Sequence, residues 1–384
     1  MAIDNKDKKI LNVPHLRFPE FTEEWKAEQL DNIATLSKGI GISKEQLSED
    51  GEPCILYGEL YTKYKSEIIK QVESKTDING SKLKRSKAND VIIPCSGETA
   101  VDIATARCVP FDNILFGGDL NVISLHQYDG AFMSYQLNGK RKYDIARVAQ
   151  GVSIVHLYGE HLKAIKTYNP TLPEQQKIAK LLSLLDDRID TQNKIIEKLQ
   201  SLIKGIAQHC IKESTSGNTY VKLGDICQIT TGKLDANAQV DNGIYPFFTC
   251  AEQPFKIDSF AFDTEALLIS GNGANLGYIN YYKGKFNAYQ RTYVLDLFSE
   301  NIQYIKWALK VLLPKRIAIE KSSSNTPYIV LSTLTDLRLP IPCKSKQSFI
   351  ANLMQSLERK LSNQIAQYDS YNYLKQYLLR QMFI

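Results

Sequence analysis

Residues 178–210 read IAKLLSLLDDRIDTQNKIIEKLQSLIKGIAQHC, and their apolar residues alternate spacings of four and three. The same pattern returns in residues 350–382, which read IANLMQSLERKLSNQIAQYDSYNYLKQYLLRQM, so that position 178 corresponds to position 350. A period of 3.5 residues is typical of a coiled-coil seam, because it keeps one narrow apolar stripe facing a partner helix. The sequence therefore predicts two long helices at equivalent places in two halves of the chain.

The two predicted helices carry matching seam residues. They are Leu182, Leu185, Ile189, Gln192, Ile196 and Leu199 in the first helix, and Leu357, Leu361, Gln364, Tyr368 and Tyr371 in the second. A single globular domain cannot cover such a seam, so we expect the helices to pack together as an antiparallel coiled coil. Gln192 and Gln364 would then lie near an approximate two-fold axis. There they either fix the register through a hydrogen bond or are simply tolerated at half-exposed positions.

The duplication extends beyond the helices. Residues 30–39 (LDNIATLSKG) share a skeleton with residues 223–232 (LGDICQITTG), and residues 90–97 parallel residues 265–271. Short β-branched and aromatic runs bounded by Gly, Asn or Pro predict many short strands in each half. We therefore expect an α+β protein with two mixed α/β domains separated by the two antiparallel helices, related by a pseudo-two-fold axis.

These patterns divide the chain into five segments. They are an N-terminal arm over 1–24, a first domain over 25–172, a central helix over 173–213, a second domain over 214–342 and a C-terminal helix over 343–384. Pro173, followed by an acid, is typical of a helix start. Residues 301–313 also have helical spacing, and we expect that helix to stop at Pro314.

The composition is ordinary for a globular protein of two domains, with 384 residues of which 43% are hydrophobic and 23% charged. No apolar run is long enough to cross a bilayer, and residues 1–9 lack the apolar segment of a secretory signal. Seven cysteines occur without a C-x-x-C pair, which favours free thiols and no zinc site. We expect a cytoplasmic protein without a membrane partner.

The most specific motif is LPEQQKIAKLL at residues 172–182, followed by LDDRID at 185–190. Together with LRFPEF at 16–21, Trp25 and the Leu-x-x-Ile…Gly start of each half, it makes the chain resemble the specificity subunit of Type I restriction–modification enzymes. The resemblance covers nearly the whole length. The Pro-Glu-Gln-Gln run is degenerate at the second helix.

This resemblance implies a subunit that reads double-stranded DNA and is not itself an enzyme. Each domain would read one half of a bipartite target, and the helices would set the spacer. Two modification subunits, which methylate adenine, would dock on the helices, and two restriction subunits would complete the complex. No cofactor or metal is expected on this chain, since S-adenosylmethionine, ATP and Mg²⁺ belong to the partners. We expect Asp186 and Asp187 on the solvent side of the first helix.

Candidate DNA contacts follow from donor chemistry, because phosphates attract cations and base edges need directional donors. The first half supplies Lys82, Lys84, Arg85, Lys87, Ser96, Thr99, Arg107, Lys140, Arg141 and Lys142. The second half supplies Ser270, Asn272, Asn275, Gln290, Arg291, Tyr293, Lys315, Arg316, Ser323 and Asn325. A net charge of +5 permits an anionic partner. Each residue is also compatible with an ordinary turn or solvated surface.

Two alternatives remain. A coiled-coil scaffold that binds proteins at both ends would lack the steep salt dependence of DNA binding. The loop at residues 271–277 resembles a dinucleotide or S-adenosylmethionine loop, but it is one residue too long for G-x-G-x-x-G and strand-like residues follow it. Neither an Asn/Asp-Pro-Pro-Tyr methyltransferase motif nor G-x-x-x-x-G-K-[ST] occurs, so the sequence does not favour a self-sufficient enzyme.

Overall fold

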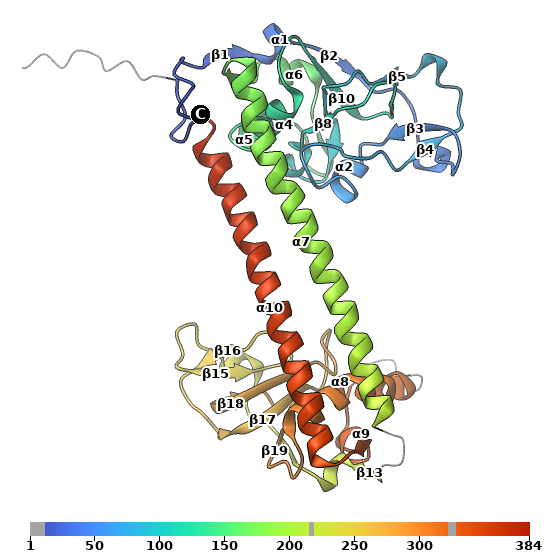
Figure 1. Ribbon diagram of the computed structural model, residues 1–384, viewed down its shortest axis with the longest axis vertical. Coiled ribbons are helices and arrows are strands. Elements are labelled where there is room, and N and C mark those ends of the chain that lie inside the picture. Colours follow the sequence, from blue (N-terminus) through green and yellow to red (C-terminus); the bar gives the residue numbers. More distant parts are fainter. Residues whose placement is uncertain (1–11, 215–218, 322–327) are drawn as a thin grey trace, which may run out of the picture. The chain divides into compact units, whose positions relative to one another are not determined.

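The computed structural model describes residues 12–214, 219–321 and 328–384, which fall into two compact units (Figure 1). Unit 1 comprises the described residues of Met1–Asn193 together with Gln367–Ile384, and unit 2 comprises those of Lys194–Ala366. Each unit therefore takes a segment from both long helices. Within the described residues, no helix combines the length and apolar character that a membrane crossing requires.

Unit 1 contains two four-stranded sheets. The first has the spatial order β2 (Ala34–Lys38), β10 (Leu120–Leu125), β6 (Asp90–Pro94), β8 (Arg107–Val109), with antiparallel neighbours throughout. The second, with one parallel pair, has the order β4 (Lys75–Thr76), β3 (Glu52–Ile55), β9 (Leu115–Phe116), β5 (Lys84–Arg85). Two further antiparallel pairs join β1 (Lys26–Gln29) to β12 (Lys166–Asn169), and β7 (Ser96–Gly97) to β11 (Val155–His156).

Short helices cover the first sheet of unit 1 (Figure 1). The helical elements are α1 (Leu30–Ile33), η1 (Lys44–Gln46), α2 (Glu59–Thr62), η2 (Gly80–Lys82), α3 (Ala100–Ile103), α4 (Gly130–Asn138), α5 (Lys142–Val148) and α6 (Gly159–Lys163). Val91 and Ile93 of the central strand β6 are fully buried against Met133 and Leu137 of α4. Burial of these side chains fixes the sheet on which the loops discussed below are mounted.

Unit 2 is built on one six-stranded sheet. Its spatial order is β14 (Gln228–Thr231), β19 (Thr292–Asp296), β17 (Phe262–Ser270), β18 (Ile279–Ala288), β15 (Tyr245–Phe248), β16 (Phe255–Ile257), and only the pair of β15 and β18 is parallel. A separate pair joins β13 (Thr219–Lys222) to β20 (Arg338–Ile341), as β1 and β12 do in unit 1. Its helical elements are η3 (Leu223–Asp225), η4 (Ala236–Ala238), α8 (Ile302–Lys321) and α9 (Leu331–Thr335).

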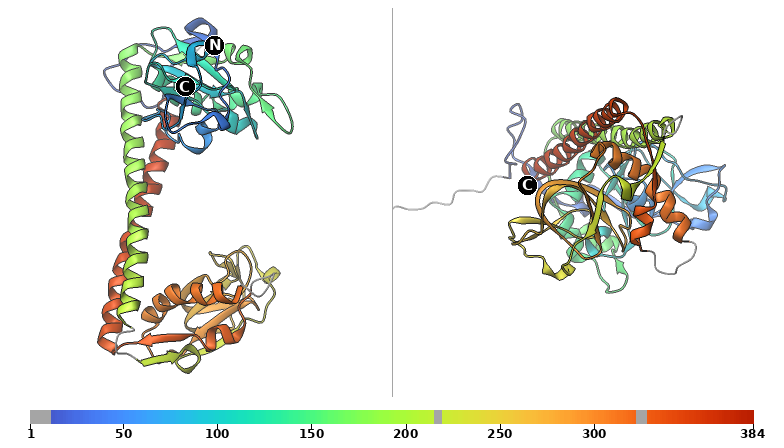
Figure 2. Two further views of the ribbon diagram at one scale, coloured as in Figure 1. Left: turned by 90° about the vertical axis from the view of Figure 1, so that its right-hand side faces the viewer. Right: turned by 90° about the horizontal axis from the view of Figure 1, so that it is seen from below.

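The helix α8 lies along one face of this sheet (Figure 2). The expectation that it stops at Pro314 was wrong, because α8 continues to Lys321 with the proline inside. A proline within a helix lacks an N–H donor and costs about 3 kcal/mol. Contacts beyond it offset this cost, since Ile317 packs on the core of the unit and Arg316 pairs with Glu320 one turn later.

The two predicted long helices are α7 (Leu172–Glu213) and α10 (Lys344–Gln381). In unit 1, Ile178 near the start of α7 shares a core with Met382 just beyond the end of α10. In unit 2, Ile203 late in α7 shares a core with Ile350 early in α10. Within both units the helices therefore pack antiparallel, and the predicted α+β fold class is confirmed.

The seam positions lie inward along both helices. Four are buried, namely Leu182, Gln192, Ile196 and Leu199. The others are half-buried, namely Leu185, Ile189, Leu357, Leu361, Gln364, Tyr368 and Tyr371. No position of the predicted seam is exposed, as expected where a 3.5-residue period faces a partner helix.

A buried glutamine joins the start of α7 to the α/β part of unit 1. The Gln175 side chain accepts a hydrogen bond from the Asp129 N–H at 2.9 Å and donates one to the Pro170 carbonyl at 2.8 Å. Asp129 in turn caps α4, because its carboxylate accepts from the Phe132 N–H. In unit 2 the same bonds recur at the equivalent residues Gln347, Asn301 and Pro342. The internal duplication thus extends to single hydrogen bonds.

Candidate nucleic-acid interface

Four loops of unit 2 meet where β17 ends and β19 begins. The Gly271 N–H donates to the Arg291 carbonyl at 2.8 Å, and the Gln290 N–H donates to the Leu234 carbonyl at 2.9 Å. The Asn275 side chain donates to the Cys250 carbonyl at 3.0 Å. We call the joined loops, residues 232–235, 249–253, 271–277 and 289–291, the unit 2 loop surface.

Glycine is required where these loops approach one another. A Cβ atom on Gly232 would lie 1.9 Å from the Ala288 carbonyl oxygen, which no side chain tolerates. Gly273 has a φ of +78°, a left-handed conformation that glycine adopts at little cost. The loop after β17 is therefore shaped by its glycines as a close-fitting backbone turn.

The unit 2 loop surface presents polar side chains to solvent from a rigid base. Gln290 and Arg291 are both exposed, and the Gln290 amide lies 3.5 Å from the Asp235 carboxylate. Asn272 is half-buried. Tyr293 faces inward instead, because its hydroxyl donates to the Ile329 carbonyl at 2.8 Å. Gln290 and Arg291 thus offer directional donors held on main-chain hydrogen bonds.

Unit 1 has a counterpart at the end of β6. The Cys95 N–H donates to the Asp119 carbonyl at 2.7 Å, which matches the bond between Gly271 and Arg291. A Cβ atom on Gly39 would lie 2.0 Å from the Gly117 carbonyl oxygen. This matches the close approach that a Cβ atom on Gly232 would make to the Ala288 carbonyl oxygen. We call residues 38–41, 95–99, 117–119 and 156–158 the unit 1 loop surface.

The polar groups of the unit 1 loop surface differ from those of unit 2. Asp119 occupies the position of Arg291, and its carboxylate lies 3.4 Å from the Ser96 hydroxyl. The Tyr61 hydroxyl donates to the Ser96 carbonyl at 3.1 Å, and burial raises the pKa of Tyr61, so the phenol stays neutral. The Lys38 ammonium lies 5.7 Å from the centre of the Tyr158 ring.

A family model described as "Type I restriction modification DNA specificity domain" matches residues 22–201 and 215–368. This chain belongs to that family. The two matches divide the chain within residues 202–214, near the end of α7, so each match holds one specificity domain and the helix segment that follows it.

Relatives share these domains over different lengths. The specificity subunit of the Type I restriction enzyme EcoDI from Escherichia coli is 44% identical over 137 residues, 36% of this chain and 30% of that protein. The MjaIX specificity subunit of Methanocaldococcus jannaschii is 25% identical and shares 56% of this chain and 59% of its own length. This chain thus spans under two thirds of the length of both. The MjaVIII subunit of the same organism is 23% identical over 92% of this chain and 90% of its own.

Two solved structures share the fold. The S subunit of a Type I restriction–modification system from M. genitalium has a TM-score of 0.69 at 19% identity and covers 97% of this chain and 99% of its own. A structure described as the basis of complex assembly and conformational transition of the Type I R-M system has a TM-score of 0.57 at 16% identity, with coverages of 94% and 97%.

In the second specificity domain, the structure brings only some of the predicted residues together. Asn272, Asn275, Gln290 and Arg291 belong to the unit 2 loop surface, whereas Ser270 is buried at the end of β17 and is not a surface contact. Lys315 is exposed on α8, and Arg316 is paired with Glu320. Ser323 and Asn325 lie outside the described residues.

In the first specificity domain, the prediction that Arg107 contacts DNA was wrong. Arg107 is 8% exposed, and its guanidinium donates to the carbonyls of Tyr64 and Ala106, so it stabilises the interior rather than a surface. Ser96 and Thr99 lie on the unit 1 loop surface. Sequence reasoning missed Lys38 and Asp119, although Lys38 directly precedes Gly39, the glycine that matches Gly232.

The predicted cations of the first domain are not among the residues of the unit 1 loop surface. Lys84 and Lys87 line a cleft with Thr35, Ser37 and His126, and Lys84 pairs with Phe116, the residue before Gly117. Lys82 is exposed and Arg85 pairs with Glu52. At the junction of α4 and α5, Lys140 and Lys142 are half-buried, and Arg141 pairs with Asp144 and donates to the Ile384 carbonyl.

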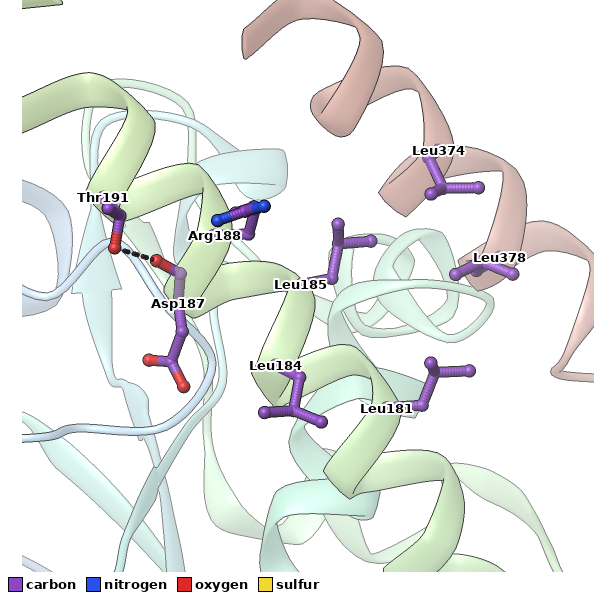
Figure 3. Close-up of a pocket in the computed structure, with 8 residues that line it drawn as sticks. All are labelled: Leu181, Leu184, Leu185, Asp187, Arg188, Thr191, Leu374 and Leu378. Atoms are coloured by element: carbon purple, nitrogen blue, oxygen red, sulfur yellow. Dashed lines mark hydrogen bonds between the residues drawn. The ribbon is translucent and has the colours of Figure 1, made fainter. Parts of the chain in front are cut away.

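An apolar groove opens between the two helices in unit 1 (Figure 3). Its walls are leucines, namely Leu181, Leu184 and Leu185 of α7 and Leu374 and Leu378 of α10. Leu184 is 52% exposed, and Asp187 and Arg188 lie along one side. We call this site, of about 490 Å³, the leucine groove. Exposed apolar patches of this kind mark interaction surfaces.

The prediction that Asp186 lies on the solvent side of the first long helix was also wrong, because this side chain is buried. Its carboxylate accepts from the Tyr135 hydroxyl at 2.7 Å and lies 2.6 Å from the Lys375 ammonium. Its counterpart in the second long helix, Glu358, likewise pairs with Lys306 of α8 at 2.8 Å. An acidic residue at this helix position therefore ties each long helix to the specificity domain beside it.

Proposed function

We propose that this chain is the cytoplasmic DNA-recognition subunit of a Type I restriction–modification complex and is not itself an enzyme. It reads a bipartite double-stranded target, with one half-site for each domain. The observation that carries this proposal is the unit 2 loop surface, where Gln290 and Arg291 are exposed at the end of a sheet. It lies in a chain that belongs to a DNA specificity family.

The residue types suit base recognition. Glutamine pairs with the edge of adenine through two hydrogen bonds, and arginine pairs with guanine in the same way. Both side chains stand on loops fixed by main-chain hydrogen bonds, so little backbone freedom is lost on binding. In the glycine loop at residues 271–277, the N–H groups of Gly271, Leu276 and Gly277 already donate to carbonyls, and the remaining N–H groups suit phosphate contacts, which position the domain without specifying sequence.

The unit 1 loop surface supports a second, different half-site. Asp119 stands where unit 2 has Arg291, and an aspartate accepts a hydrogen bond from the amino group of cytosine. Lys38 offers a donor nearby. Two surfaces with different donors and acceptors would read two unlike half-sites, so the proposed target is asymmetric.

The partners belong to the same proposal. Two modification subunits would dock on the helices, with the leucine groove as one docking surface, and two restriction subunits would complete the complex. S-adenosylmethionine, ATP and Mg²⁺ would be bound by these partners. The helices α7 and α10 would set the number of base pairs between the half-sites.

Adenine-methylation mapping by long-read sequencing tests the proposal. Cells that express this chain with the modification subunit of its own system should gain one split motif, whereas cells without this chain should not. Failure to gain a motif, with both proteins present and associated, would contradict the proposal.

Two variants test the reading residues. Gln290→Ala with Arg291→Ala should relax or abolish recognition of one half-site while the other half-site and assembly with the modification subunit are retained. Arg291→Lys keeps the charge but not the two-pronged donor, so a base reader should lose specificity and a phosphate contact should not. Loss of assembly in these variants would show that the residues are structural.

Salt dependence separates this proposal from the scaffold alternative. The affinity of the assembled complex for DNA should fall steeply as salt rises, because bound phosphates release counterions. A scaffold that binds only proteins at its two ends would show no DNA affinity to titrate.

A further inference from the structure

We infer that the chain binds its two modification subunits with unequal affinity, and that the one docked on unit 1 is held more tightly. The inference rests on the proposed function and concerns the docking surfaces on the helices. It follows from a comparison of the leucine groove with the residues that the internal repeat places at the same positions of unit 2.

The α7 wall of the leucine groove is only partly repeated in α10. The counterparts of Leu181 and Leu185 are Leu353 and Leu357, so two apolar positions are kept. Leu184, however, is matched by Ser356, which is also exposed. At the position of the most exposed leucine on this wall in unit 1, unit 2 therefore has a serine.

The opposite wall differs as well. Leu374 of α10 is matched by Leu202 of α7, and both are exposed. Beside Leu374, unit 1 exposes the rings of Tyr373 and Tyr377, at 76% and 47%. Their counterparts in unit 2 are Ser201 and Gly205, which carry no apolar surface of comparable size. At these matched positions unit 1 therefore carries the larger exposed apolar side chains, although a groove of about 500 Å³ also opens on α7 in unit 2 beside Leu202.

Unit 2 also exposes apolar helix residues whose counterparts in unit 1 are polar, namely Ile195 (matched by Gln367), Ile365 (matched by Asn193) and Phe349 (matched by Lys177). Phe349 is 66% exposed near the start of α10, where the repeat places Lys177 in α7. The Lys177 ammonium lies over the Phe18 ring of the N-terminal arm instead. Phe349 lies one turn before Leu353, outside the positions that match the groove, so it does not replace Leu184.

The charge beside the two surfaces also differs, because one acidic position in unit 1 is basic in unit 2. Unit 1 carries Asp187 and Arg188, and Asp187 is paired with Lys70. Their counterparts in unit 2 are Arg359 and Lys360, both exposed cations. A partner surface that complements an acid and a base cannot equally complement two bases, because like charges at a contact oppose binding.

The internal repeat indicates which protein binds the helix surfaces of both units. The loop surfaces differ between the units, whereas the helices repeat in register over residues 178–210 and 350–382. A partner that must serve both halves alike has to use what the halves share, which is the helix pair. Two identical modification subunits meet that requirement, while the differences at residues 184 and 187 make their two sites unequal.

The test titrates the full chain with the modification subunit of its own system and counts bound subunits by native mass spectrometry. We expect a complex with one modification subunit to accumulate before the complex with two. The two dissociation constants should differ by about ten-fold or more, since burying one leucine side chain contributes on that order. Equal, independent binding would overturn the inference.

Two reciprocal variants identify the tighter site. Leu184→Ser should weaken the first step about ten-fold and bring the two dissociation constants together, whereas Ser356→Leu should tighten the second step. Neither variant alters a loop surface, so recognition of both half-sites serves as the control. If neither variant changes a dissociation constant, residues 184 and 356 do not cause the difference in affinity, and the assignment of the tighter site to unit 1 is overturned.

This design separates failure of the inference from failure of the proposed function. If the modification subunit does not bind at all, the proposed function is wrong. If two subunits bind equally and the split motif is methylated, the proposed function holds and the inference is wrong. Self-association of the chain without a modification subunit, abolished by Leu184→Ser, would identify a second copy as the occupant of the groove instead.

Discussion

Lys375 lies between two buried carboxylates in unit 1, 2.6 Å from Glu67 and 2.6 Å from Asp186. Burial works against the ammonium charge, yet attraction by both carboxylates outweighs it and raises the pKa of Lys375. For Glu67, burial is likewise outweighed by Lys375, so the pKa of this carboxyl is lowered. One cation on α10 therefore holds the first specificity domain and α7 together.

Replacing Lys375 by methionine should strongly destabilise unit 1. The change removes the cation that is paired directly with two buried carboxylates and leaves only the more distant Arg107, and breaking a buried ion pair typically costs about 3–5 kcal/mol in the free energy of unfolding. The chain has two tryptophans, so in a Trp307→Phe background the fluorescence of Trp25 reports on unit 1 during urea unfolding. Adding Glu67→Gln and Asp186→Asn should recover most of the loss. An unchanged urea midpoint in the single variant would contradict this role.

The same cluster predicts an acid-sensitive contribution to stability. Because the pKa of Glu67 is lowered from 4.5, its stabilisation is present above pH 4.5 and is lost as the pH falls through the folded-state pKa. Burial raises the pKa of Asp186, which opposes this trend. The raised pKa of Lys375 matters only at alkaline pH, because its contribution is complete below its ordinary pKa of 10.5.

Glu67→Gln should therefore lower the stability of unit 1 at neutral pH and weaken its dependence on acid. The Trp25 urea midpoint would be compared between pH 7 and pH 3 in the variant and the parent. An equal drop in both proteins would show that other carboxylates control the acid response.

At the scale of elements, the repeated glutamines Gln175 and Gln347 link each long helix to the capping residue of a domain helix. Both are buried, so each satisfies polar backbone groups that water does not reach. The motif at residues 172–182 thus has a structural role, because its glutamine connects the start of α7 to the domain beside it. This explains why a glutamine recurs in α10 although the rest of the motif is degenerate there.

Gln175→Leu should leave the Asp129 N–H and the Pro170 carbonyl without a partner, at a cost of about 1–3 kcal/mol for each buried group. Gln347→Leu should do the same in unit 2. Hydrogen exchange should show the loss locally, at the start of α4 for the first variant and of α8 for the second. Amide protection equal to that of the parent protein at both helix starts would contradict this structural role of the glutamines.

Sequence reasoning found the helices because their 3.5-residue period is a local signal. It placed Ser270 and Arg107 on the surface wrongly, since a donor after a strand reads the same whether its partner is DNA or a main-chain carbonyl. Arg107 satisfies the carbonyl of Tyr64, which lies several elements earlier in the chain. The loop surfaces depend on hydrogen bonds between loops far apart in sequence, so sequence reasoning named single residues such as Gln290 and Arg291 but could not show which loops join.

For the whole molecule, the proposed role of the helices as a spacer predicts the effect of shortening both. Deleting residues 193–199 and 365–371 removes one heptad at matching positions and keeps the seam in register. Seven residues of helix span about 10 Å, or about three base pairs of DNA. Methylation mapping should show both half-sites unchanged with a spacer shorter by about that number. An unaltered spacer would rule out this role.

The composition of unit 1 has a consequence for biosynthesis. Its core includes Leu378, Leu379 and Phe383 packed with Trp25, so residues 367–384 complete a unit whose other part ends at Asn193. Unit 2 is one continuous stretch of chain. On the ribosome, the domain translated first is therefore the last that can finish folding. A stop codon before residue 378 would damage the half-site reader encoded at the beginning of the gene and leave the core of the later one complete.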